Sequence, residues 1–281
     1  MILVVITTCN QLEYTKLTID SLKRTTEKFD VLVIDDFSQD DTISYLENEE
    51  FCGNVIVKKE PRGLTNSWNT AYDYFKKSTY EFLFLLNNDI LVPDGAITNM
   101  VEVLEEEVDA VVSPLCNIYG VKRNPMQSVG MWYDEVTEDY ENDPNNYQEI
   151  QDRMNEVEYQ GKKKVYIDAA TLEPPNINGF VLGFNRSIEK CEFSETELFD
   201  PKNINIGNEV ELATRLKRKN FQELICAKSF VFHYKGITLG ETDRNNLNKI
   251  HGIPKEKIFI QPDTSELKIN NLSTGNFLKD T

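Results

Sequence analysis

The first 115 residues alternate short apolar runs with helical patterns, and this alternation constrains the fold more than any other feature of the sequence. Each run is short and rich in residues that are typical of strands; the five runs are Ile2–Ile6, Val31–Ile34, Val55–Val57, Phe82–Leu86 and Ala110–Val112. Because the runs are continuously apolar, they predict strands that are buried on both faces. Strands that alternate with helices favour an α/β fold with a mostly parallel, doubly wound (Rossmann-type) sheet.

The helices between these runs are indicated by apolar residues at positions i, i+3, i+4 and i+7. Two segments follow this spacing: Trp68, Ala71, Tyr72 and Phe75, and then Ile97, Met100, Val101 and Leu104. The tetrapeptide Ser38-Gln39-Asp40-Asp41 has the pattern of a capping box and predicts a helix that runs toward Tyr45. We expect these helices to flank the sheet.

Regular patterning is lost from Ile118 to about Asn176 and then resumes. Between Met131 and Gln160, ten acidic residues accompany a single basic one, Arg153. After this insertion we expect a strand, a helix and a last strand, at Ile177–Phe184, about Glu209 to Lys219, and Phe230–His233. Because no repeat or low-complexity linker separates the halves, we predict one domain over residues 1–240, with halves 1–115 and 116–240. Residues 241–281 form an extension to which the sequence assigns no role.

The chain carries 30 Lys and Arg against 47 Asp and Glu, a formal net charge of −17. Because such a charge repels phosphate polymers and anionic bilayers, it argues against a nucleic-acid partner and a membrane-surface role. We expect no integral membrane segment, since no apolar run reaches the length of a span. Five widely spaced cysteines without a Cys-x-x-Cys pair, and the lack of a signal sequence, predict a reduced, cytoplasmic protein.

Polar residues follow three of the predicted strands, as Thr7-Thr8-Cys9-Asn10, Asp35-Asp36 and Asn87-Asn88-Asp89. Ligands of open α/β sheets bind outside the carboxyl ends of the strands. Each aspartate alone is equally well explained as a turn or helix cap. Their recurrence at one edge of the predicted sheet favours a binding site.

The sequence also limits what this site binds. Neither a Gly-x-Gly-x-x-Gly fingerprint nor a Gly-x-x-x-x-Gly-Lys-Ser/Thr loop follows the first strand. With few glycines to cradle phosphate, a diphosphate would need a metal ion to neutralise it. An oxygen ligand such as Asp89 suits Mg²⁺ or Mn²⁺.

In this order, the motifs resemble those of family 2 glycosyltransferases with the GT-A fold. The resemblance rests on motifs spread over residues 1 to about 240: Val4–Asn10, Val33–Asp40, Leu85–Asp89, Asn178–Arg186, Phe199-Asp200, Gly207–Leu212 with Arg215, and Val231–Tyr234. The Leu86-Asn87-Asn88-Asp89 form resembles the rhamnosyltransferase-like branch. The resemblance implies transfer of a sugar from a nucleoside-diphosphate sugar to an acceptor hydroxyl with inversion of the anomeric carbon.

The resemblance also implies roles for individual residues on the donor side. Asp35 matches the residue that receives the nucleobase N–H, and Thr8 and Asn10 lie on the loop that contacts the nucleoside. The other donor-binding candidates are Arg62, Gly63, Asn69, Asn87 and Asn88. Asp89 matches the last residue of the family's Asp-x-Asp motif, which binds a Mn²⁺ or Mg²⁺ ion. Asn87 replaces the first aspartate, which weakens the electrostatic case for tight metal binding.

Two further roles come from the second half of the chain. His233, in Val-Phe-His-Tyr, matches a second metal ligand, although a lone histidine at a strand end is more often structural. Glu209 aligns with the general base, and Glu211 is the second acid of that block. A helix start would help to keep Glu209 ionised, and substrate burial would raise its pKa. A register error of one or two residues would transfer the role to Glu211. The alternative is that both residues are ordinary acids in the first turn of a helix.

The acidic, aromatic insertion lies where this family binds acceptors. Its aromatic rings suit sugar rings and its carboxylates suit hydroxyl donors, whereas composition supports a solvated, partly mobile flap equally well. The partners implied are a nucleoside-diphosphate sugar and a glycan or other glycosylated acceptor. A second class of function stays open, a non-catalytic nucleotide- or glycan-binding protein that retains the fold, because Asn87 and the altered Glu209 block depart from the family pattern.

Overall fold

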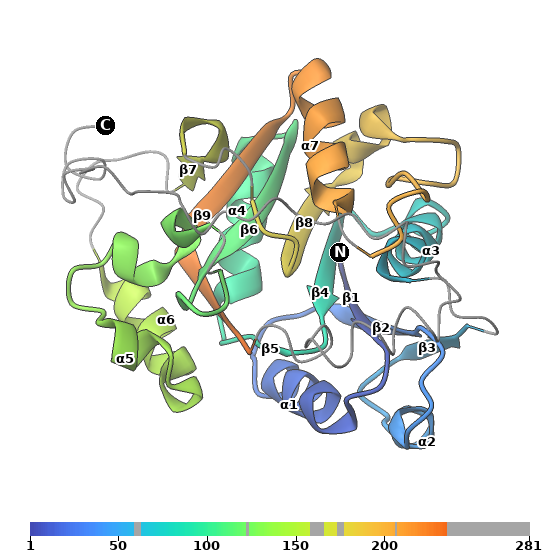
Figure 1. Cartoon of the computed structure of the whole chain (residues 1–281), viewed down its shortest axis with the longest axis horizontal. Helices are drawn as coiled ribbons and strands as arrows, with labels where there is room; N and C mark the ends of the chain where they lie inside the picture. Colours follow the sequence, from blue (N-terminus) through green and yellow to red (C-terminus); the bar gives the residue numbers. More distant parts are fainter. Residues whose placement is uncertain (59–62, 122–123, 158–165, 173–176, 206, 235–281) are drawn as a thin grey trace.

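A computed structural model describes residues 1–58, 63–121, 124–157, 166–172, 177–205 and 207–234. Nine strands in this part of the chain form one sheet of order β3-β2-β1-β4-β8-β6-β9-β5, with β7 paired to β9 (Figure 1). The strands are β1 (Ile2–Thr8), β2 (Asp30–Asp35), β3 (Asn54–Val57), β4 (Phe82–Asn87), β5 (Ile90–Leu91), β6 (Ala110–Cys116), β7 (Tyr166–Asp168), β8 (Val181–Asn185) and β9 (Gln222–His233). Arg62 and the extension 241–281 lie outside the described residues.

The sheet is mostly parallel in its first half and mixed in its second. Strands β3, β2, β1 and β4 are parallel neighbours, as are β6 and β9. Strand β8 lies between β4 and β6 and runs antiparallel to both. The carboxyl ends of β1, β2, β4, β6 and β9 therefore meet at one edge, which we call the carboxyl edge; the opposite edge is the amino edge.

Helices cover both faces of the sheet. They are α1 (Leu12–Lys23), α2 (Thr42–Leu46), α3 (Leu64–Lys76), α4 (Ala96–Glu106), α5 (Glu138–Glu141), α6 (Tyr147–Glu156) and α7 (Asn208–Arg218). Short 3₁₀ helices add Pro125–Gln127, Val129–Met131, Pro144–Asn146, Ala169–Thr171 and Arg186–Cys191. One apolar cluster joins the sheet to α1, α2 and α4, and the other joins it to α3, α6 and α7.

Alternation along β1 explains the two clusters. Leu3 and Val5 enter one of them, and Val4 and Ile6 enter the other. A parallel strand buried on both faces needs apolar residues at every position, as the sequence predicted. The predicted α/β fold is thus confirmed, with strand bounds within a few residues of those expected, except that β9 begins at Gln222 rather than Phe230.

The predicted capping box at Ser38 is wrong. Helix α2 begins at Thr42, whose backbone N–H donates to Asp40 Oδ1 at 3.0 Å. The Ser38 hydroxyl instead accepts a hydrogen bond from the backbone N–H of Asn10 at 2.7 Å. A contact between two loops therefore uses the side chain that local sequence assigned to a helix end.

The described part of the insertion packs on the sheet. Helix α6 lies against β9, and its Ile150 and Met154 are buried in the same apolar cluster as α3 and α7. The carboxylate of Glu141 at the end of α5 is buried and accepts hydrogen bonds from the backbone N–H groups of Ile118 and Gly130, at 3.2 and 2.9 Å. This segment is thus held by apolar packing against the sheet and by the hydrogen bonds of a buried carboxylate.

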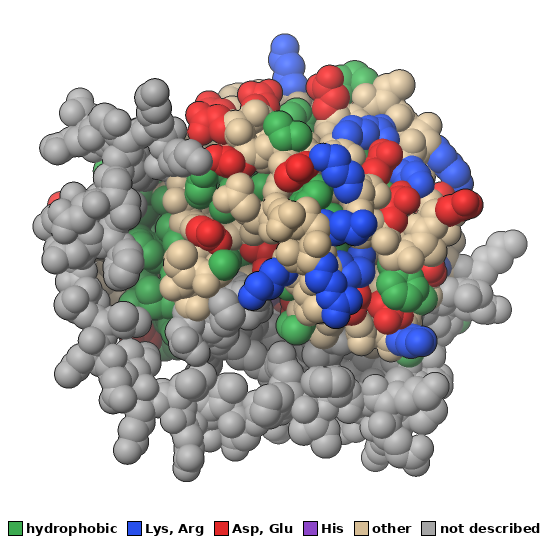
Figure 2. Space-filling model, turned by 90° about the horizontal axis from the view of Figure 1, so that it is seen from above, with side chains coloured by type: hydrophobic (Ala, Val, Ile, Leu, Met, Phe, Trp, Pro, Cys, Tyr) green, Lys and Arg blue, Asp and Glu red, His purple; other side chains and the backbone are tan. Residues whose placement is uncertain are grey.

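Charge is mixed on the face seen from above in Figure 1, where α7 ends. Figure 2 shows Lys and Arg side chains gathered there, interspersed with Asp and Glu. Near the amino edge, Lys190 pairs with Asp109 at 2.7 Å, and Lys76 pairs with Glu192 at 2.6 Å. None of the helices in the described ranges is long and apolar enough to cross a membrane.

Candidate functional site

The loops that follow β1, β2 and β4 are hydrogen-bonded to one another at the carboxyl edge. In the sheet register Thr8 pairs with Asp35, and Thr7 pairs with Asn87. Asn10 Oδ1 accepts from the Gln39 N–H at 2.6 Å, beside the Ser38 bond described above. These contacts fix two loops that are 28 residues apart in the chain.

Asn88 joins the third loop to the first. Its amide Nδ2 donates to Thr8 Oγ1 at 3.1 Å, to Thr15 Oγ1 at 2.9 Å and to the Asn10 carbonyl at 3.4 Å. Asn88 and Thr8 are both buried. Both predicted donor-binding residues are therefore part of the framework that shapes the loops.

Asp35 is the most unusual carboxylate of this edge. It is fully buried, and the backbone N–H of Ser38 donates to its Oδ1 at 2.9 Å. Its Oδ2 is also buried and has no hydrogen-bond partner among the described residues. Burial raises the pKa of Asp35, and the nearby carboxylates of Asp36 and Asp40 add to the rise. A buried acceptor without a donor is costly, so a ligand N–H would stabilise it.

Sequence reasoning missed the ion pair of Asp36 with Lys58, which lies next to Asp35. Lys58 follows β3, and its Nζ contacts Asp36 Oδ1 and the hydroxyl of Ser67, the latter at 3.0 Å. Both charged side chains are more than nine-tenths buried. The sequence signal that could have revealed this pair is an acid directly after β2 and a lysine directly after the neighbouring strand β3. The pair places a positive charge beside the candidate nucleotide position.

Asp89 and His233 lie together. His233 Nε2 is 3.2 Å from Asp89 Oδ1, and His233 Nδ1 is 3.2 Å from the Gly120 carbonyl oxygen. The Nε2 and Oδ1 atoms are both of types that a divalent cation binds in proteins.

The donor set fits Mn²⁺ or Mg²⁺ in part. Carboxylate oxygen suits both ions, and imidazole is a ligand that Mn²⁺ tolerates. Within the described ranges, no group of three or more His, Cys, Asp or Glu side chains gathers to hold a metal ion. Two protein ligands leave positions for substrate phosphates and water, which is how Mg²⁺ is usually bound in phosphate sites.

Glu209 lies on the wall formed by the start of α7 and residues 179–180. A Cβ atom placed on Gly179 would be 3.7 Å from Glu209 Cδ and 3.1 Å from Trp68 Cη2. The next residue, Phe180, stacks on the His233 ring with centroids 5.2 Å apart. The segment Gly179-Phe180 therefore connects Glu209 to the Asp89–His233 pair. Asn87 joins the same segment, because its N–H donates to the Phe180 carbonyl at 3.0 Å.

Glu211 points to a different partner. Its carboxylate makes two hydrogen bonds to the guanidinium of Arg215, at 2.6 and 2.7 Å. Arg215 in turn donates to the Leu198 carbonyl at 2.6 Å. This paired arrangement fixes the loop before α7.

Gly63 and Asn69 contact the segment that precedes α7. Gly63 has a φ of 83°, and a Cβ there would be 2.7 Å from the Ile204 carbonyl oxygen. The Asn69 side chain accepts from the Phe199 N–H at 2.9 Å and donates to the Phe199 carbonyl, also at 2.9 Å. Asn69 thus has its amide occupied by protein backbone.

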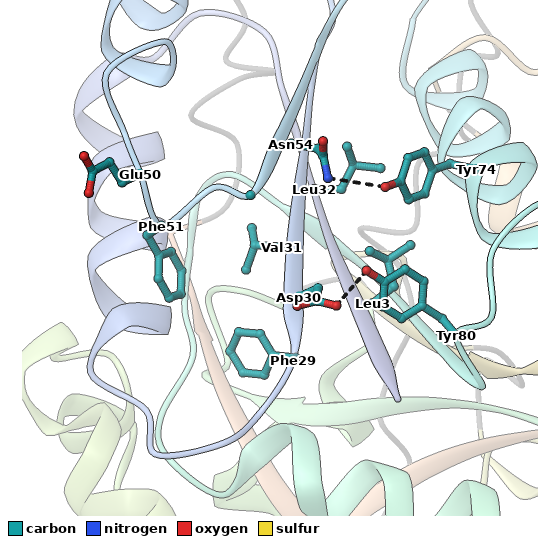
Figure 3. A pocket seen from close by; sticks show the side chains of 11 residues that line it. Leu3, Phe29, Asp30, Val31, Leu32, Glu50, Phe51, Asn54, Tyr74 and Tyr80 are labelled. Atoms are coloured by element: carbon teal, nitrogen blue, oxygen red, sulfur yellow. Dashed lines mark hydrogen bonds between the residues drawn. The ribbon is translucent and has the colours of Figure 1, made fainter.

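A pocket of about 520 Å³ lies at the amino edge, away from all of these groups (Figure 3). Its walls include Phe29, Phe51, Tyr74 and Tyr80. The Tyr80 hydroxyl donates to Asp30 Oδ2 at 2.7 Å, as Figure 3 shows. This pocket and the predicted site residues therefore lie at opposite edges of the sheet.

Comparison with models of protein families gives a match over the first part of the chain. The model of the family described as "Glycosyl transferase family 2" matches residues 3–169. This range contains Asp35 and Asp89 but ends before Glu209 and His233. Comparison with curated proteins gives no match.

Solved structures of similar fold include three glycosyltransferases or related proteins. The mannosyltransferase PcManGT from Pyrobaculum calidifontis, in complex with GDP-Man and Mn²⁺, has a TM-score of 0.56 and 14% identity over 89% of this chain. GalNAc-T7 with UDP, GalNAc and Mn²⁺ has a TM-score of 0.58 and 15% identity over 83%. S. aureus TarS has a TM-score of 0.54 and 14% identity over 90%. The matches span 62%, 43% and 39% of those chains, and at these identities they establish the GT-A type of fold.

Proposed function

The chain belongs to glycosyl transferase family 2, and from this premise we propose that it transfers a sugar from a nucleoside-diphosphate sugar to an acceptor hydroxyl. The proposed reaction inverts the anomeric carbon and is assisted by Mn²⁺ or Mg²⁺. One observation supports the proposal most strongly: the hydrogen-bonded loops at the carboxyl edge connect Asp35 to Asp89, and Asp89 contacts His233. Residues 179–180 connect this group to Glu209.

The nucleobase would bind at Asp35. Its partnerless Oδ2 supplies an acceptor for an imide N–H, and the hydrogen-bonded loops hold it at the strand end. Asn10 and Gly63 would line the same part of the site through their backbone. Arg62, which precedes Gly63, stays a proposed donor contact.

Asp89 and His233 would hold the metal ion. When bound, the ion supplies positive charge that stabilises the departing diphosphate. The chain's own contribution is to orient His233, whose Nδ1 contacts the Gly120 carbonyl, so that Nε2 faces Asp89. Asn87 adds an amide in place of a carboxylate.

Glu209 would act as the general base toward the acceptor hydroxyl. It lies at the start of α7, where the helix dipole favours a carboxylate. Glu211 is the weaker candidate, because Arg215 already binds both of its oxygens. We assign Glu211 the role of positioning the loop before α7.

The finer features of the activity rest on sequence motifs. Leu86-Asn87-Asn88-Asp89 supports a hexosyl or deoxyhexosyl donor of the rhamnosyltransferase-like branch. The aromatic and acidic insertion supports a glycan or glycosylated acceptor. All five cysteines are buried free thiols, which supports a cytoplasmic site of action.

Nucleotide binding tests the donor site directly. UDP, GDP and dTDP, each with Mn²⁺, should be assayed by thermal unfolding, since a ligand that binds only the native state raises Tm. One of them, at 100 times its Kd, should raise Tm by roughly 5 °C. The variant Asp89→Ala should lose the Mn²⁺-dependent part of the rise, and Asp30→Ala, at the amino edge, should retain it.

Three outcomes decide the proposal. No rise with any nucleotide in the wild-type protein would exclude the donor site. An unchanged Mn²⁺-dependent rise in Asp89→Ala would remove Asp89 from it. A rise without any transfer or hydrolysis across a panel of nucleotide sugars would favour the binding-only alternative, which the departures at Asn87 and Glu209 keep open.

A further inference from the structure

We propose that Asn117, at the start of the insertion, positions His233 as a metal ligand, so that the insertion and the metal site form one unit. The inference rests on the proposed function for the role of His233. It goes beyond that function because Asn117 belongs to none of the family motifs and contacts His233 from 116 residues away in the chain.

Asn117 continues the sheet by means of its side chain. The parallel ladder of β6 and β9 ends at the pair Cys116 and Val231. One residue further, Asn117 Oδ1 accepts from the His233 N–H at 2.8 Å, and Asn117 Nδ2 donates to the His233 carbonyl at 3.3 Å. The side chain is 1% exposed. A single buried amide thus satisfies both backbone groups of the metal-ligand candidate.

The same short segment fixes the ring of His233. The Gly120 carbonyl oxygen is 3.2 Å from His233 Nδ1. A Cβ on Gly120 would be 2.8 Å from Asn117 Oδ1 and 2.9 Å from His233 Cβ. The backbone at Gly120 can approach the histidine this closely only because no side chain intervenes.

The contacts continue into the folded insertion. Asn117 Nδ2 also donates to Asn142 Oδ1 at 3.1 Å, and Asn142 Oδ1 accepts from the Tyr119 N–H at 3.2 Å. Asn142 directly follows Glu141, whose buried carboxylate anchors Ile118 and Gly130. The path from α5 to His233 is therefore made of hydrogen bonds between rigidly held groups.

Removal of this support should weaken metal binding more than it weakens the fold. Groups that orient a metal ligand typically change metal affinity by 10–100-fold when they are mutated. Mn²⁺ uptake should be measured from the free-ion EPR signal of the full chain, at saturating UDP or GDP. In Asn117→Ala, the half-saturating Mn²⁺ concentration should rise at least about tenfold.

Asn185 provides a matched control. It is also a buried asparagine that bonds backbone groups, with Nδ2 donating to the carbonyls of Leu104 and Val108 at 3.0 and 2.8 Å, but it ends β8 at the amino edge. Asn185→Ala should lower Tm to a similar extent and leave the half-saturating Mn²⁺ concentration unchanged. If Asn117→Ala does not fold, Asn142→Ala, which removes the outer link, should show a smaller rise in the same direction.

A metal-free measurement separates this inference from the proposed function. The chain has two histidines, His233 and His251, so the imidazole ¹⁵N spectrum is simple and His251→Gln assigns it. In the metal-free protein, the asparagine test variant should change the ¹⁵N shifts of the His233 ring, and Asn185→Ala should leave them as in the wild type. Equal Mn²⁺ affinity in the folded test variant and Asn185→Ala, or unchanged His233 ring shifts in the test variant, overturns the inference. If the wild-type protein takes up no Mn²⁺, the proposed function fails and the inference fails with it, whereas Mn²⁺ uptake with equal affinities overturns the inference alone.

Discussion

The two ends of strand β2 each carry an aspartate, and the two carboxylates differ in exposure and in hydrogen bonding. Asp30 begins the strand, is exposed and accepts a hydrogen bond from Tyr80 beside the pocket of about 520 Å³. Asp35 ends the strand, is fully buried and keeps one oxygen without a partner among the described residues. The pocket lies at the amino end of β2, and the partnerless oxygen of Asp35 lies at its carboxyl end.

Three of the four non-glycine residues with positive φ among the described residues lie in loops at the carboxyl edge: Asn10, Gln11 and Phe37, with φ values of 59°, 63° and 69°. The fourth, Asn220 with a φ of 58°, lies between α7 and β9 at the amino edge. Non-glycine residues with such φ values cost about 1–3 kcal/mol each and persist only where their surroundings hold them. The positive-φ loops and the partnerless oxygen of Asp35 therefore favour the carboxyl edge as the functional one, although the pocket of about 520 Å³ lies at the amino edge.

The largest expected effect comes from the proposed base. Glu209→Gln keeps the shape of the side chain but cannot accept a proton, so transfer should fall about 10²–10⁴-fold. Nucleotide binding should be unchanged, because Glu209 lies on α7 beside Gly179, whereas Asp35 ends β2. Transfer rates and nucleotide-induced Tm shifts measure the two quantities separately.

The matched control lies beside the amino-edge pocket. Glu50→Gln makes the same chemical change at an exposed residue that lines that pocket, and it should leave transfer unchanged. Full activity in Glu209→Gln would exclude Glu209 as the base and make Glu211 the next residue to test. Loss of activity in Glu50→Gln would reverse the assignment of the functional edge.

The two ends of β2 give a more direct test. Asp35→Asn should weaken nucleotide binding about 10–100-fold, since a hydrogen bond to a charged group contributes about 1.5–3 kcal/mol. Asp30→Asn should leave nucleotide binding unchanged. Isothermal titration with the preferred nucleotide measures both variants, and equal affinities in the two would show that the partnerless oxygen of Asp35 does not bind the base.

Asp35→Asn should also change how stability depends on pH. Burial raises the pKa of Asp35, so the folded state binds the proton more tightly than the unfolded state does. That stability is present below the unfolded pKa and is lost as the pH rises through the folded one. Near pH 7 the wild-type protein therefore holds a costly buried charge, which the asparagine removes. A protein that gains stability while it loses nucleotide affinity would show that the site is maintained for function.

The first half of the fold was predictable because its signals are local. Strands such as Val31–Ile34 and Phe82–Leu86 are continuous apolar runs, and a buried parallel strand needs no other pattern. The carboxyl-edge residues Asp35 and Asp89 followed from strand ends. The start of β9 was missed because residues 222–229 mix polar and apolar side chains, which pack against β7 and α6.

The contacts that support the site were not predictable, because their partners are distant in the chain. Asn88 bonds Thr8 from 80 residues away, and Asn117 bonds His233 from 116 residues away. Neither asparagine differs from a turn residue in sequence. In the insertion, buried residues such as Val136 and Ile150 are too sparse among acids to show a period, so its packing on the sheet could not be read from composition.

The smallest expected effect tests whether a perturbed pKa alone marks the functional edge. Glu223, the second residue of β9, lies at the amino edge, and burial, with a smaller contribution from the Asp168 charge, raises its pKa to about 7. The folded state is thus stabilised below the ordinary value of 4.5, and this stability is lost as the pH rises through about 7. Such a change corresponds to roughly 3 kcal/mol at most, and partial exposure should reduce it to about 1–2 kcal/mol.

Glu223→Gln should therefore be more stable than the wild-type protein by about 1–2 kcal/mol at pH 8 and equal to it near pH 4.5, as measured by urea unfolding across pH. Exposed Glu105→Gln makes the same charge change on α4 and controls for net charge. Nucleotide affinity should be the same in all three proteins, because no contact connects Glu223 to Asp35 or Asp89 in the described ranges. Altered nucleotide affinity in Glu223→Gln would mean that the amino and carboxyl edges are coupled through β9, which also carries His233 at its other end. The two edges would then not be functionally separate.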